Sequence, residues 1–296
     1  MNIDTVVHDF IIKERLPKEY RHIALKWFVP LAKTLSKHHD GAGGTLIIGL
    51  NGCQGSGKST LSALLTQLLT QVFDKMSISM SIDDFYYSRA HRKTLSETVH
   101  PLLQTRGVPG THDANLLLSC IKALKNQQHC EIPVFDKSID DVLPPNQHIQ
   151  IKKAFDIVIL EGWCVGMLAQ EDGELTKGVN DLEINEDPNG IWRRFVNKSL
   201  ETTYQTVFSE IDYLVMLQAP SFASVYNWRL QQENKLIDTL KAKNLPLNKA
   251  MNELQVGRFI QHYQRLTEYA LDILPARADA LFILNQHREI IKCQMT

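Results

Sequence analysis

The stretch "IIGLNGCQGSGKSTLSALLTQLL", residues 47–69, decides the fold, because it joins two apolar runs through a loop rich in glycine. The first run, "TLIIGL" (45–50), has the continuous apolar character of a short buried strand. The second places its apolar residues at the spacing of one helical face: Leu61, Leu64, Leu65, Leu68, Leu69 and Val72. A strand, a flexible loop and a helix in this order predict a site that holds phosphate.

The loop itself carries a phosphate-binding motif. Gly52, Gly57, Lys58 and Ser59 fit the pattern G-x-x-x-x-G-K-[ST] without a gap. A polyphosphate needs several converging N–H donors, and glycine lets the backbone approach it closely. The helix that begins near Lys58 adds the positive end of its dipole. We expect Lys58 to reach the β- and γ-phosphates of ATP and Ser59 to hold Mg²⁺. The expected nucleotide-binding residues are Gly52, Cys53, Gln54, Gly55, Ser56, Gly57, Lys58, Ser59 and Thr60.

Composition narrows the class of protein. The chain has 296 residues, 44% hydrophobic and 22% charged, with a net charge of −1, as in ordinary soluble globular proteins. This charge does not indicate a general nucleic-acid binder, although it leaves room for a local basic pocket. No apolar run is long enough to cross a bilayer, and the start, "MNIDTVVHDFIIKERL", does not resemble a signal peptide. We therefore expect a cytoplasmic protein without a membrane partner, and its five scattered cysteines are interpreted as reduced thiols.

Further strand and helix patterns alternate along the chain. Strands are expected at 76–82, 155–160, 212–217 and 280–284, and helices at 116–124, 191–208 and 222–243. This alternation predicts an α/β protein with the P-loop NTPase fold, in which helices cover both faces of a mostly parallel sheet. Residues 3–39 have helical spacing with a kink at Pro30. We expect residues 1–44 to form a helical extension packed on a kinase domain of residues 45–296, and the acidic segment 170–188 to be a surface excursion.

Two carboxylates follow strand patterns and are candidates for chemistry. Asp83 comes at the end of the second strand pattern, where a carboxylate can orient an alcohol and take its proton during phosphoryl transfer. Its neighbour Asp84 could serve instead, or cap a helix. Glu161 ends the strand pattern "VILEGW", where a carboxylate can hold Mg²⁺ directly or through water.

The remaining candidates lie in loops and on one helix. "QTRGVPGTHDANLL" (104–117) contains Arg106 and His112, which could bind an anionic or hydroxylated substrate, and Asp113, which fits equally a helix N-cap. Lys137 in "PVFDKS" is either a ligand or a solvated charge. Arg229 could stabilise the transferring phosphoryl group from a mobile lid, or form a surface salt bridge on its helix.

Together these residues resemble the phosphate-loop small-molecule kinases that include uridine kinase, phosphoribulokinase and bacterial pantothenate kinase. The chain is most similar to the D-glycerate 3-kinase family and its bacterial and fungal relatives. The resemblance is carried by "GCQGSGKSTL", "SIDDFY", "RGVPGTHD", "PVFDKS", "LEGWCVG", "LEINEDPNGIWRRFVN" and "LQAPSFASVYNWRLQQE", in this order from residue 52 to 233.

The resemblance implies phosphorylation of a small hydroxylated acid by ATP. It implies Asp83 as the base, Glu161 near the metal, and Arg106, His112 and Tyr86 toward the acceptor. The chain departs from the pattern after Glu233, where the expected short glycine-containing lid turn is missing from the sequence.

Three hypotheses follow. The first is a kinase acting on a small acid, D-glycerate above all; the second keeps the chemistry but takes a nucleoside, pantothenate or a sugar phosphate as acceptor. The third is a nucleotide-dependent switch or ATPase without a small acceptor. A switch needs no acceptor pocket, so the candidate acceptor residues named above count against this hypothesis. The oligomeric state stays open.

Overall fold

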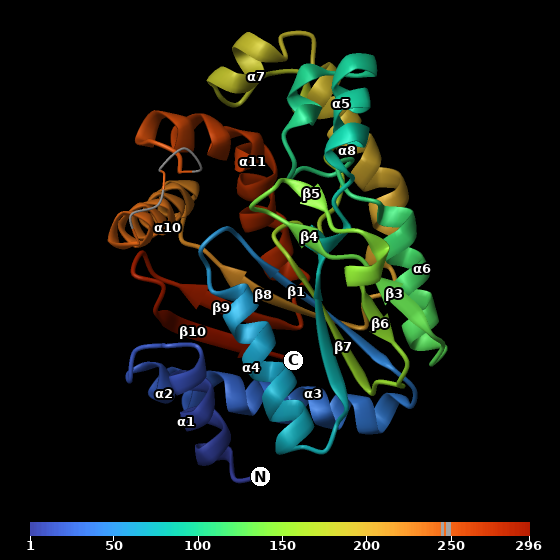
Figure 1. Cartoon of the computed structure of the whole chain (residues 1–296), viewed down its shortest axis with the longest axis vertical. Coiled ribbons are helices and arrows are strands. Elements are labelled where there is room, and N and C mark those ends of the chain that lie inside the picture. Colours follow the sequence, from blue (N-terminus) through green and yellow to red (C-terminus); the bar gives the residue numbers. More distant parts are fainter. Residues whose placement is uncertain (244–245, 247–249) are drawn as a thin grey trace.

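The computed structural model describes residues 1–243, 246 and 250–296 and has one six-stranded sheet with helices on both faces (Figure 1). The strands of this sheet are β1 (Leu46–Gly52), β2 (Ser77–Ser81), β7 (Ile157–Gly162), β8 (Tyr213–Gln218), β9 (Ala280–Leu284) and β10 (Ile290–Met295). Their order is β10-β9-β8-β1-β7-β2, and β10 alone runs antiparallel to its neighbour. The predicted α/β fold with a mostly parallel sheet is confirmed.

Two small antiparallel pairs stand beside this sheet. β3 (Cys130–Ile132) pairs with β6 (Ile149–Ile151), and β4 (Phe135–Asp136) pairs with β5 (Asp141–Val142). The helices are α1 (Ile3–Lys13), α2 (Tyr20–Ile23), α3 (Val29–Ala42), α4 (Lys58–Gln71), α5 (Arg89–Thr98), α6 (Ala114–Lys125), α7 (Asp181–Glu186), α8 (Ile191–Ser199), α9 (Gln205–Phe208), α10 (Phe222–Ala242) and α11 (Glu253–Ile273). None of the helices in the described part of the chain has the length and apolar character that a membrane span requires.

The centre of the sheet explains why the strand patterns were continuous rather than alternating. Every residue of β1 and of β7 is buried, because α4 packs on β1, β2 and β7 while α6, with α9 beside it, packs on β1 from the other face (Figure 1). A parallel strand covered on both faces has no polar side. β1 lies between β7 and β8, so the loop after β1 opens at the edge where the carboxyl ends of three parallel strands meet.

The N-terminal helices pack on this core. Val6, Phe10 and Leu31 are buried in the same apolar cluster as the sheet, and the ring of Phe28 meets that of Phe282 in β9 edge-on, with centroids 5.9 Å apart. A π-helical turn (Ala24–Phe28) ends where α3 begins, with Pro30 in the first turn of α3. The helical backbone continues through Pro30, which is tolerated in the first turn of α3 because its missing N–H is not needed there, and the kink at Pro30 stays a prediction. The division of the chain at residue 44 stays a prediction.

The interpretation of residues 170–188 as a surface excursion is wrong for the two acids that anchor this segment. Glu183 and Asp187 are at most 1% exposed. Arg265 of α11 donates to both oxygens of Glu183, at 2.8 and 2.6 Å, and Arg193 pairs with Asp187 at 2.9 Å. The segment therefore joins α7 to α8 and α11 through buried ion pairs.

The substitution Arg265→Met tests this anchoring. It would leave Glu183 as a buried carboxylate without its partner, so we expect the free energy of unfolding to fall by about 3–5 kcal/mol, measured by urea denaturation. Arg258→Met is the matched control on the same helix, because Arg258 pairs with Glu186 where both side chains are more than 40% exposed. The control should lose less than about 1 kcal/mol. Equal losses in the two variants would contradict the assignment.

Candidate active site

The loop after β1 has the backbone geometry of a phosphate cradle. Gly57 caps α4 in the left-handed region, with φ +94°, and Gly55 has φ +79°. A Cβ on Gly55 would lie 2.8 Å from the Cβ of Trp228 in α10, so only glycine fits between the loop and this helix. The loop therefore presents its N–H groups and the N-terminus of α4 at the carboxyl end of the sheet.

One side chain inside the loop is left without a protein partner. Ser56 is buried, and its hydroxyl has no hydrogen-bond partner within the described residues. Such a group is expected where a ligand oxygen completes the site. Cys53 plays no comparable part, because burial raises the pKa of its thiol to about 12, against the opposing effect of Lys58.

Two oxygens beside the loop fit a hard cation. The Ser59 hydroxyl donates to Oε1 of Glu161 at 2.9 Å, while Oε2 of Glu161 is buried without a hydrogen-bond partner in the described part of the chain. Hydroxyl and carboxylate oxygens are the ligands that Mg²⁺ takes, with water and phosphate completing its shell. The residues predicted for the metal therefore lie together and have a free oxygen.

Asp83 lies just past β2, which ends at Ser81, in a 3-10 turn, η2 (Ile82–Phe85). Ser81 and Asp84 form a reciprocal cap at this turn: Ser81 accepts from the Asp83 N–H, and the Asp84 carboxylate accepts from the Ser81 N–H. Burial raises the pKa of Asp84 to about 6. Of the two acids, Asp84 serves as a cap and Asp83 faces other functional groups.

The Asp83 carboxylate is held by two partners. The Tyr86 hydroxyl donates to it at 3.0 Å and the Lys137 ammonium at 2.5 Å. Burial alone raises the pKa of Asp83, but the charges of Lys137 and Lys58 outweigh it, and the pKa lies below its ordinary value. Burial, with the Asp83 charge, raises the pKa of Tyr86 well above its own, so this hydroxyl stays a donor. Asp83 is thus an anion at neutral pH, within electrostatic reach of the lysine of the loop.

His112 belongs to the same cluster as Asp83 and Tyr86. Its ring stacks on Tyr86 with centroids 4.3 Å apart, and Nδ1 lies 2.6 Å from the hydroxyl of Tyr204. Burial lowers the pKa of His112 to about 4, so the ring is neutral at pH 7. Nε2 is buried without a partner among the described residues. His112 can therefore share a hydrogen bond with a hydroxyl but supplies no charge to an acid. Asp113, beside it, is the N-cap of α6 and accepts from the Leu116 N–H.

A cleft of about 1310 Å³ brings the remaining candidates together. Arg106, Lys137 and Arg229 all line it. α10 and α11 form one side, and α5 with the β4–β5 pair forms the other (Figure 1). The connection between α10 and α11, where the expected lid turn was missing from the sequence, includes residues 244, 245 and 247–249, which lie outside the described residues.

Each of these three cations already holds a carboxylate of the chain. Lys137 holds Asp83, Arg106 holds an aspartate on the β4–β5 turn, Asp140, and Arg229 holds Glu233 at 2.5 Å. Neither Asp140 nor Glu233 was among the residues predicted from the sequence. Glu233 lies four residues after Arg229 on one helix, a spacing that predicts an ion pair. Asp140 has no such local signal, because its partner is 34 residues away.

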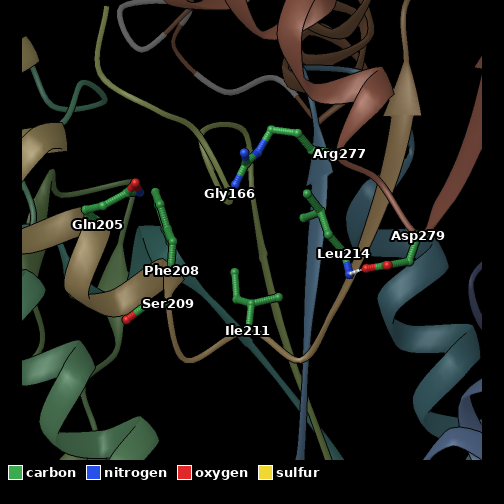
Figure 2. Close-up of a pocket in the computed structure, with 8 residues that line it drawn as sticks. All are labelled: Gly166, Gln205, Phe208, Ser209, Ile211, Leu214, Arg277 and Asp279. Carbon is green, nitrogen blue, oxygen red and sulfur yellow. Dashed lines mark hydrogen bonds between the residues drawn. The ribbon is translucent and has the colours of Figure 1, made fainter.

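Two further hollows differ in their relation to the loop. One, of about 570 Å³, lies beyond the carboxyl ends of β8 and β9 and includes Gln286. Trp228 donates to the carbonyl of Gln286 at 2.8 Å. The same Trp228 is the residue that a Cβ on Gly55 of the loop would meet. The other, of about 300 Å³, includes Leu214 and Asp279, at the opposite ends of the same strands (Figure 2). There the Asp279 carboxylate accepts from the Leu214 N–H at 2.7 Å and is structural.

Comparison with known proteins identifies the family of the chain. The family model described as "Phosphoribulokinase / Uridine kinase family" matches residues 47–189. An uncharacterized kinase, mug58, of Schizosaccharomyces pombe is 35% identical over 79% of this chain and 83% of its own length. The chloroplastic D-glycerate 3-kinase of Arabidopsis thaliana is 28% identical over 74% of this chain, and the matched part covers 46% of that protein's length.

A solved structure supports the same relationship. The D-glycerate 3-kinase from Cryptococcus neoformans superimposes with a TM-score of 0.72 at 26% identity, over 90% of this chain and 97% of that one. The chain belongs to the Phosphoribulokinase / Uridine kinase family, and it is a phosphate-loop kinase that transfers a phosphoryl group from ATP to a hydroxyl acceptor.

Proposed function

We propose that this kinase phosphorylates a hydroxyl of a small carboxylic acid, D-glycerate above all, to give 3-phosphoglycerate. The observation that carries the proposal is the Asp83 carboxylate, which is held as an anion by Tyr86 and by Lys137, and Lys137 lines the same cleft as Arg106. The names of two relatives, both D-glycerate 3-kinases, support the choice of acceptor.

In this proposal the residues divide the work by charge. Lys58 and the N–H groups of the loop hold the phosphates, and the Asp83 carboxylate orients the acceptor hydroxyl and takes its proton. Ser59 and Glu161 would hold Mg²⁺, which when bound neutralises charge on the phosphates. The neutral ring of His112 and the hydroxyl of Tyr86 keep Asp83 and the acceptor hydroxyl in place. Arg229 faces the same cleft and would stabilise charge on the transferring group.

Arg106 is the residue that would recognise the acid group. Its guanidinium lies over the ring of Phe135, 5.5 Å from the centroid, which fixes the plane of the fork. The side chain uses Nη1 to bind Asp140, and its other nitrogens, Nε and Nη2, have no hydrogen-bond partner in the described part of the chain. An arginine binds a carboxylate through two parallel hydrogen bonds, and in this proposal the acid of the acceptor takes Nη1 and Nη2, so that Asp140 gives up Nη1.

The first experiment is a measurement of ADP release by the purified protein with Mg·ATP. The acceptors are D-glycerate, L-glycerate, pantothenate, uridine and ribulose 5-phosphate, each at the same concentration. We expect release that depends strongly on D-glycerate. Stimulation by pantothenate or ribulose 5-phosphate alone would move the substrate to another anion, and stimulation by uridine alone would overturn the acid acceptor.

Asp83→Asn tests the proposed base. The amide keeps the size of the side chain but cannot take a proton, so we expect kcat to fall by about 10²–10⁴-fold while the Kd for ATP changes little. Asp84→Asn is the control, since the amide oxygen can still cap the turn, and its kcat should stay within a few-fold of the unmodified protein. A larger loss in Asp84→Asn than in Asp83→Asn would exchange the two roles.

Arg106→Ala tests recognition of the acid. Loss of a charge-assisted contact costs about 1.5–3 kcal/mol, so the KM for D-glycerate should rise by roughly 10–150-fold with a smaller change in the KM for ATP. Arg89→Ala serves as the control for the general charge of the cleft, because Arg89 also lines it. Equal effects of the two substitutions would show that charge alone, and not Arg106, attracts the acceptor.

A further inference from the structure

Asp140 has an unusual place in the cleft. It lies on the turn between β4 and β5, in the left-handed region with φ +57°. One carboxylate oxygen accepts from Nη1 of Arg106, and the other lies 3.0 Å from Nη2 of Arg92. The chain thus places a carboxylate of its own on the arginine that the proposed function assigns to the acid of the acceptor.

The two arginines that share Asp140 differ in how firmly they are fixed. Arg92 is 1% exposed and donates to the carbonyls of Tyr87, Gln104 and Asp140. If Arg92 moved away, these three carbonyls would lose their hydrogen-bond donor, so Arg92 is firmly fixed. Arg106 makes no second side-chain hydrogen bond within the described residues, and its side chain is 28% exposed.

Exchange of partners at Arg106 is consequently easy. Ion pairs as exposed as Arg106–Asp140 contribute little to stability. If Arg106 turned to another carboxylate, Asp140 would keep its contact with the fixed Arg92 and would not be left as an isolated charge. A buried pair such as Arg265–Glu183 has no such alternative partner.

We propose that Asp140 is a specificity-determining residue that occupies Arg106 in the empty cleft and is displaced from it by the acid group of the acceptor. This inference rests on the proposed function. The internal carboxylate competes with the acceptor for one arginine and so raises the KM for acids. A neutral alcohol cannot displace it, and Arg106 then adds no ion pair to the binding of that alcohol.

Asp140→Asn is the variant that separates competition from structure. Asparagine is among the residues that tolerate a positive φ, and its amide oxygen can still accept from Arg92. We expect the KM for D-glycerate to fall by about two- to fivefold, the ratio that corresponds to a part-exposed ion pair, with kcat within twofold. Urea denaturation should show that the variant is folded.

Asp141→Asn is the matched control. Asp141 is the next residue and lines the same cleft, but its carboxylate accepts from the backbone N–H groups of Arg89 and Val142 and does not touch Arg106. It removes the same charge, so any fall in KM that it shares with Asp140→Asn is a general electrostatic effect. In an Arg106→Ala background, Asp140→Asn should no longer lower the KM, because the arginine for which the two acids compete is gone.

The outcomes separate this inference from the function on which it rests. D-glycerate-dependent ADP release by the unmodified protein, combined with an unchanged or raised KM in Asp140→Asn, would overturn the inference alone. A raised KM would mean that Asp140 holds Arg106 in its productive position. Release with uridine and with none of the acids would overturn both proposals together.

Discussion

The parallel pairing of β1 with β7 is the constraint on which the rest of the site depends. Its register sets Leu50 opposite Glu161 and Asn51 opposite Gly162, so the phosphate loop and the acid of β7 emerge at the same edge of the sheet. Ser59, in the first turn of α4, then reaches Glu161 at 2.9 Å. A shift of one residue would turn the Glu161 side chain to the other face of the sheet. The buried apolar faces of both strands hold this register.

Near that edge of the sheet, positively charged side chains are already paired with carboxylates of the chain. The three cations of the cleft that the sequence suggested for ligand binding are each paired with a carboxylate: Asp83, Asp140 or Glu233. Of these carboxylates, Glu233 would be costly to leave unpaired, because it is buried. In the proposed function, the binding of an anionic ligand to one of these cations would be an exchange of partners, and the pairs differ in how firmly their carboxylates are held. Glu233 is 2% exposed and also accepts from the Met251 N–H, whereas Asp140 is more than a third exposed.

The parts of the fold that could be predicted are those whose signal is local and strong. Four of the five parallel strands were recognisable because burial on both faces demands continuous apolar runs, and β2, which is only partly buried, was recognisable by its alternating pattern. The antiparallel edge strand β10 was missed, because most of its residues are exposed and its sequence, "IIKCQM", has a mixed character. Two acids of the segment 170–188, which is otherwise mostly exposed, were misjudged for the opposite reason. Its acids look suited to water, yet Glu183 finds its arginine 82 residues further along the chain, and no pattern of spacing indicates a partner at that distance.

The sequence by itself determined that the chain binds a polyphosphate and belongs to the α/β class. A phosphate loop is built from contiguous residues, and its glycines and lysine act through local backbone geometry. Only the tertiary structure decided the rest of the chemistry. Asp83 rather than Asp84 faces Lys137, His112 is neutral, and Arg106 meets Asp140. These properties arise from burial and from contacts between residues 34 to 92 positions apart. Burial and long-range contacts both depend on how the elements pack together, and neither is encoded in any one stretch of the chain.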